Sequence, residues 1–159
     1  MKNVSFRFAT KDDCELVLQF IKDLAKYEKL ENEVVATKEL LDKWLFDEKK
    51  AEVLFISEND EVAGFALFFT TFSTFWARPG IHLEDLYVSP KFRGLGYGKK
   101  ILQELSKITV QRGYGRLEWW CLNWNQPSID FYKSLGAQTM DEWTDYRLSG
   151  RALTDLSNK

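Results

Sequence analysis

The sequence predicts an α/β fold, in which a mixed sheet of parallel and antiparallel strands carries helices on both faces. Short segments alternate apolar and polar residues, whereas other segments repeat apolar residues every three or four positions. The two patterns are interleaved, so both hairpins and helical crossovers are expected. The chain has 159 residues and no internal repeat or linker. We therefore expect a single domain over residues 1–159.

The residue pattern in the N-terminal third of the chain predicts one strand and two helices. Alternation predicts a strand over residues 4–9, and Thr10 with Asp13 resembles a capping box that opens a helix. Apolar residues between 14 and 25 share one helix face. The acidic segment 28–33 predicts a loop, and Thr37 caps a shorter helix.

The middle of the chain is rich in strands. Residues 53–57 and 62–71 predict a hairpin around the polar turn 58–61. A loop over residues 73–80 is expected to lead into a strand over residues 81–88, which stops before Pro90.

Helices and strands alternate in the last third. The pattern predicts a helix over 98–112, a strand over 116–122, a helix over 127–135 and a strand over 143–148, followed by a short helix or tail. Frayed structure is expected only at a tail such as residues 156–159.

Charge and hydropathy exclude several classes of partner. The formal net charge of −2 provides no basic surface for nucleic acid. The longest apolar stretch lies around positions 63–69. It is too short for a membrane span, and no signal peptide is apparent. We expect a cytoplasmic protein without nucleic-acid or membrane partners. Cys14 and Cys121 lack metal-ligand spacing, so we expect buried thiols and no metal site.

The turn between residues 93 and 98, Arg-Gly-Leu-Gly-Tyr-Gly, joins a predicted strand to a predicted helix. Unpaired amides at a helix start attract phosphate, and Arg93 adds a forked cation. A P-loop is excluded because the required Gly-Lys-Ser/Thr is missing. The spacing Gly-x-Gly-x-Gly differs from the Gly-x-Gly-x-x-Gly of dinucleotide-binding folds. A connector without a ligand stays open.

The segment VSPKFRGLGYGKKIL, residues 88–102, resembles the acetyl-CoA turn of GNAT N-acetyltransferases. The segments IKDLAKYE, LED and WNQPSIDFYKSLGA are similar, in order and separation, to the diamine (spermidine/spermine) and thialysine acetyltransferase branch. The resemblance implies a GNAT-like fold, acetyl-CoA as cosubstrate and a homodimer. It assigns CoA binding to Leu86, Tyr87, Val88, Arg93, Gly94, Leu95, Gly96, Tyr97, Gly98, Lys99, Asn125 and Ser128. Asn125 is equally explained as a helix cap.

Acetyl transfer to an amine requires an uncharged amine and a proton for the departing thiolate. An alkylammonium has a pKa near ~10.4 and is mostly protonated at neutral pH, and a carboxylate with a bound water could relay its proton away. Glu84 resembles the family residue in that role, although an outward-facing strand glutamate is the alternative. Tyr132 resembles the family's proton donor to the CoA sulfur, and its alternative is a buried core tyrosine.

The same resemblance implies an acidic, aromatic amine pocket. Its residues are Tyr27, Glu28, Glu84, Asp85, Glu118, Trp119 and Trp120. Aromatic faces beside carboxylates suit an ammonium ion. His82 lies in phase with Glu84, which suggests a general base, although no spacing provides it with a nucleophile. The loop around Trp76 differs from that of the diamine enzymes and leaves the amine open.

These expectations describe an enzyme that acetylates a primary amine of a small cationic molecule by direct transfer in a ternary complex. Diamines and polyamines come first, and thialysine or another lysine-like amino acid comes second. Transfer to a protein or peptide, and a non-catalytic CoA-binding sensor, are the further alternatives.

Overall fold

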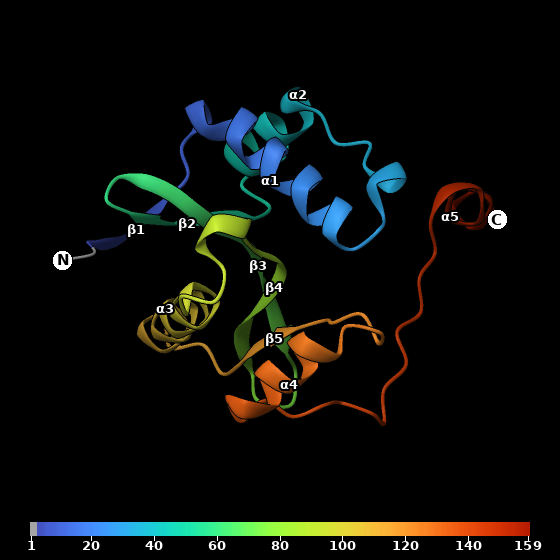
Figure 1. The fold of residues 1–159 in the computed structure, drawn as a ribbon. Helices are drawn as coiled ribbons and strands as arrows, with labels where there is room; N and C mark the ends of the chain where they lie inside the picture. The colour runs from blue at the N-terminus through green and yellow to red at the C-terminus, as the bar shows by residue number, and fades with distance from the viewer. Residues whose placement is uncertain (1–2) are drawn as a thin grey trace. The chain divides into compact units, whose positions relative to one another are not determined.

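The computed structural model describes residues 3–159, and the chain divides after Trp120 into two compact units. The first unit contains a five-stranded sheet in the order β1-β2-β3-β4-β5 (Figure 1). Its strands are β1 Val4–Phe8, β2 Glu52–Glu58, β3 Glu61–Ser73, β4 Arg78–Val88 and β5 Leu117–Trp119. The first four pair antiparallel, and β5 is parallel to β4. The predicted mixed sheet is confirmed.

Helices cover both faces of this sheet (Figure 1). The helical segments of the first unit are η1 Lys11–Asp13, α1 Cys14–Tyr27, η2 Glu31–Glu33, α2 Lys38–Leu41, the π-helical η3 Asp42–Asp47, η4 Pro90–Phe92 and α3 Tyr97–Gln111. Phe20 of α1 stacks on Phe65 of β3, with ring centroids 5.2 Å apart. Tyr87 of β4 packs in the same core cluster as Phe20, on the α1 face of the sheet. The neighbouring Leu86 points to the opposite face, where it lies beside Gly98 of α3.

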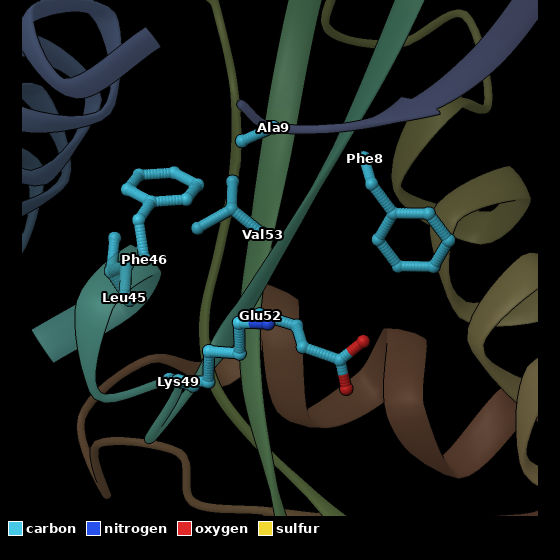
Figure 2. A pocket seen from close by; sticks show the side chains of 8 residues that line it. Phe8, Ala9, Leu45, Phe46, Lys49, Glu52 and Val53 are labelled. Carbon is cyan, nitrogen blue, oxygen red and sulfur yellow. The ribbon is translucent and has the colours of Figure 1, made fainter. Parts of the chain in front are cut away.

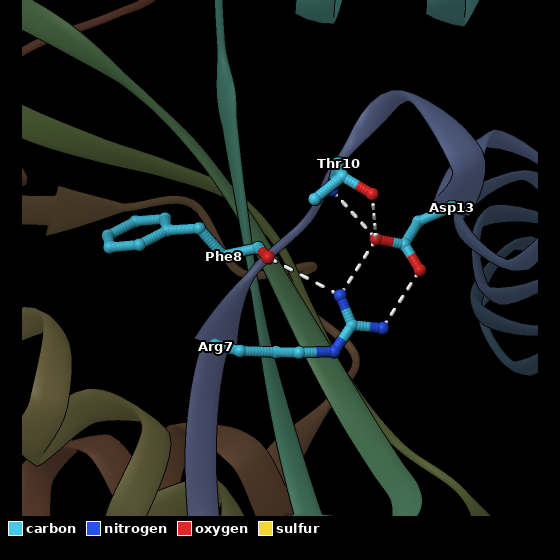
Figure 3. A network of polar contacts seen from close by, with 4 residues as sticks. All are labelled: Arg7, Phe8, Thr10 and Asp13. Carbon is cyan, nitrogen blue, oxygen red and sulfur yellow. Dashed lines mark hydrogen bonds and ion pairs between the residues drawn. The ribbon is translucent and has the colours of Figure 1, made fainter.

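The junction between β1 and α1 is closed by a polar network (Figure 3). The Asp13 carboxylate accepts the backbone amide proton of Thr10 at 2.7 Å, which confirms the predicted capping box. Arg7 donates two hydrogen bonds of 2.8 Å to the same carboxylate. This guanidinium lowers the pKa of Asp13 to about 2.

The hairpin of β3 and β4 extends beyond the predicted strands. The loop predicted over residues 73–80 is shorter in the structure. Only residues 74–77 form the turn, because Phe72 pairs with Pro79 and Ser73 pairs with Arg78. Cross-strand pairing overrides the local signal of Pro79 and Gly80. The strand predicted over residues 116–122 is shorter, and pairs with β4 only over β5.

The second unit contains α4 Gln126–Ser134 and α5 Gly150–Ser157. Asn125 caps α4, and Gly136 follows the helix with a φ of 87°, as the sequence predicts. The strand predicted over residues 143–148 is wrong: this segment has no regular structure, and the described part of the unit contains no strand to pair with it. The tail is helical up to Ser157. Cys121 is half-buried and lies outside any helix or strand.

Candidate active site

A β-bulge in β4 shapes the candidate site. Leu67 pairs with Asp85 and the next residue, Phe68, pairs with Leu83, so Glu84 has no register partner. Phe69 then pairs with His82, and Leu67 and Phe69 lie on one face of β3. His82 and Asp85 therefore share a face although they are three residues apart.

Three carboxylates meet where β4 and the end of α1 come together. Burial raises the pKa of Asp85 to about 7, and the negative charges of Glu84 and Glu28 contribute to this rise. Burial and the charge of Glu84 likewise raise the pKa of Glu28. Glu28, Glu84 and Asp85 were predicted as one acidic group, and the structure brings them close enough to repel one another. Such a group favours a cationic ligand.

The raised pKa of Asp85 predicts a pH-dependent cost in stability. Its pKa of about 7 lies above the ordinary 3.8, so the folded chain retains a proton that the unfolded chain releases. Stability should therefore fall as the pH rises from about 4 to about 7. We expect the Tm of D85N relative to wild type to rise over this range and then stay level, measured by thermal unfolding. The exposed Asp145 supplies the control: D145N should show no such trend, and a flat D85N difference would contradict the prediction.

An aromatic wall lies beside the carboxylates. The His82 side chain is 9% exposed. Its ring stacks on that of Phe69 with centroids 5.0 Å apart and meets the edge of the Trp120 ring at 5.3 Å. Glu118 of β5 pairs in register with His82 and therefore shares its face. Trp119 pairs with Leu83 and therefore points to the face of the sheet opposite to Asp85. Its predicted place beside the carboxylates is wrong.

The glycine turn prepares the start of α3 for an anion. Gly94 has a φ of 75 and Gly96 a φ of 81 degrees, and this left-handed conformation favours glycine. The amide of Lys100 donates to the Gly96 carbonyl at 3.1 Å, which is the first hydrogen bond of the helix. The amides that precede this bond have no acceptor within the helix. A Cβ added to either glycine would meet nothing within 4 Å, so the backbone is open to a ligand. The turn thus fits a phosphate group.

The Arg93 side chain ties this turn to the acidic site. Its Nε donates to the Val88 carbonyl at 2.9 Å, and its guanidinium lies over the rings of Tyr27 at 5.1 Å and Tyr87 at 5.2 Å. Burial raises the pKa of Tyr87. The predicted forked cation is therefore held between α1 and β4 by two aromatic rings.

Other residues predicted to bind CoA have defined local roles. The buried Tyr97 donates its hydroxyl proton to the Glu58 carboxylate. In the second unit, the Oδ1 atom of Asn125 accepts the Ser128 amide proton at 3.4 Å, which confirms its capping role. Tyr132 is half-buried on α4, with its ring 5.5 Å from that of Phe131.

A pocket elsewhere in the first unit shares no residue with this site. It lies between β1, η3 and β2 (Figure 2). Its apolar lining comes from Phe8, Ala9, Leu45, Phe46, Ala51 and Val53. Over residues 3–159, no group of three or more His, Cys, Asp or Glu side chains is arranged to hold a metal ion. The helices of the same residues include none with the length and hydropathy of a membrane span.

Sequence reasoning missed Phe69. This side chain forms one wall of the His82 site, and the bulge in the partner strand brings the two rings into register. The sequence did contain a signal for it, because Leu67 and Phe69 are two residues apart in a phenylalanine-rich strand and therefore share one face.

Comparison with known proteins adds sequence and fold relatives. Residues 18–137 match the model of the Acetyltransferase (GNAT) family. The chain is 35% identical to a thialysine N-epsilon-acetyltransferase of Bos taurus, and the alignment covers 100% of both chains. It is 29% identical to the spermidine/spermine N(1)-acetyltransferase-like protein 1 of Homo sapiens, over 99% of this chain and 24% of that one. An integron cassette protein from the mobile metagenome of V. cholerae has a TM-score of 0.82 at 26% identity, with 98% of each chain covered.

Proposed function

The chain belongs to the GNAT family of acetyltransferases and is an enzyme, and on that premise we propose that it acetylates a primary amine of a small cationic molecule. The observation that carries this proposal is the carboxylate cluster of Glu28, Glu84 and Asp85. A cationic substrate is attracted to such a cluster, whereas an anionic one is repelled.

Acetyl-CoA, the cosubstrate of this family, is the proposed acyl donor, and its thioester supplies the acetyl group. The turn amides and Lys99 would hold the pyrophosphate, supported by the open left-handed backbone at Gly94 and Gly96. The backbone of residues 86–88 would contact the pantetheine arm. Asn125 and Ser128 are proposed CoA contacts in addition to their capping bond.

Two side chains would move protons during direct transfer in a ternary complex. Glu84 would accept the ammonium proton through a bound water, because most alkylamine is protonated at neutral pH. Tyr132 would donate a proton to the departing thiolate. Tyr27, Glu118 and Trp120 are proposed to complete the amine site, whereas Trp119, on the other face of the sheet, is not.

Two amine classes have separate support. The carboxylate cluster favours a diamine or polyamine, because a second positive charge remains after the reacting amine is deprotonated. The full-length relatives favour a lysine-like amino acid, since several are named thialysine N-epsilon-acetyltransferases. We further propose a single domain over residues 1–159, a homodimer and a cytoplasmic location.

A thiol-release assay with acetyl-CoA tests the proposal. Putrescine, spermidine, spermine, lysine, thialysine and a peptide panel are compared at equal concentration. We expect saturable release with at least one small amine and a higher kcat/KM for it than for any peptide. The preferred amine identifies the class. Peptides reacting faster than every free amine would favour a protein acetyltransferase, and no release with any amine would favour a sensor.

A further inference from the structure

One buried titratable side chain on β4 has no role in the function proposed above. The His82 side chain is 9% exposed and is confined by the rings of Phe69 and Trp120. Its Nε2 atom lies 3.8 Å from Oε2 of Glu84.

We propose that His82 is a positioning residue for Glu84, whose carboxylate it orients toward the acceptor amine. The proposal rests on the proposed function, because Glu84 is there the group that receives the ammonium proton. His82 itself need not touch the substrate, since an imidazole nitrogen that carries a proton can donate to a neighbouring carboxylate.

Glu84 needs such a partner because of the bulge. It has no register partner in β3, and its side chain is 52% exposed, so strand pairing does not orient it. A misplacement of about 1 Å in a reacting group can cost about 100-fold in rate. The rigid ring of His82 offers a fixed point next to an exposed carboxylate.

Of the carboxylates that share this part of the sheet with His82, which include Asp85 and Glu118, Glu84 is the one within ion-pair distance of the imidazole. Phe69 on β3 and Trp120 after β5 are uncharged, and Glu118, opposite on β5, forms an ion pair with Arg116 at 3.4 Å. The separation of His82 and Glu84 is just longer than a hydrogen bond. Such contacts often tighten when the substrate is bound.

Two substitutions separate positioning from packing. H82F retains a planar ring between Phe69 and Trp120 but has no donor, whereas H82Q places an amide nitrogen near the position of Nε2. We expect H82F to lower kcat by about 10- to 100-fold with little change in either KM. H82Q should recover most of the loss. Equal losses in both variants, or a loss confined to KM, would overturn the proposal.

A second measurement does not depend on turnover. His82 is the sole histidine of the chain, so ¹H–¹³C spectra contain one imidazole cross-peak to follow. We expect this peak to move in E84Q and to stay in place in E104Q, which changes a carboxylate paired with Lys107 on α3. An unmoved peak in E84Q overturns the contact whatever the enzyme acetylates. A moved peak together with an enzyme that acetylates no amine would overturn the proposed function instead, and with it the catalytic part of this proposal.

Discussion

Replacing Tyr132 by Phe should lower kcat by about 10- to 10,000-fold and leave the affinity for acetyl-CoA almost unchanged. A phenol with a pKa near ~10 is protonated at neutral pH and lies within ~2 pKa units of a thiol near ~8.5. It can therefore share its proton with the sulfur as the thioester breaks. The substitution removes only the hydroxyl and retains the ring that packs beside Phe131.

The measurement pairs steady-state kcat with acetyl-CoA binding by calorimetry. The control is Y146F, since Tyr146 is 90% exposed in the same unit and should change neither quantity. A collapse of acetyl-CoA affinity in Y132F would show that this tyrosine is structural. An unchanged kcat would exclude it as the proton donor.

Local signals predicted much of the fold. The capping box at Thr10 and Asp13, the Asn125 cap and Gly136 were predicted correctly because each depends on neighbours within a few residues. The mixed sheet was also predicted, because interleaved periodicities report connectivity. The segment 143–148 shows the limit of such signals: its alternation is typical of a strand, but strand formation depends on a partner that local sequence does not specify.

The candidate site shows a similar division. The glycine turn and the acidic group could be predicted from the residue types in the sequence. The bulge was not, because the register between Leu67 and Asp85 is a property of two paired strands. Simple alternation would place Glu84 in phase with His82 and Asp85 out of phase with both. Only the observed register explains why His82 and Asp85 share a face, and why Phe69 contributes a wall.

Replacing Glu84 by Gln should lower kcat/KM for the amine by about 100- to 10,000-fold near neutral pH. Glutamine retains the size of the side chain but cannot accept the ammonium proton. The expected deficit depends on pH. The uncharged fraction of an amine with a pKa near ~10.4 rises about 100-fold between pH ~7 and ~9, so solvent increasingly replaces the base. The deficit should therefore narrow as the pH rises.

The pH profiles of E84Q, wild type and the control E104Q distinguish catalysis from binding. A deficit of constant size from pH ~7 to ~9 would mean that Glu84 acts by charge or structure and not as the base.

The same substitution also acts on Asp85, whose pKa of about 7 is due first to burial and next to the charge of Glu84. Without that charge Asp85 should ionise at a lower pH, although burial still holds its pKa above the ordinary value. The decline in stability between pH ~4 and ~7 should therefore end at a lower pH in E84Q than in wild type. This shift in stability is independent of turnover, so it tests the carboxylate cluster even if Glu84 is not the base.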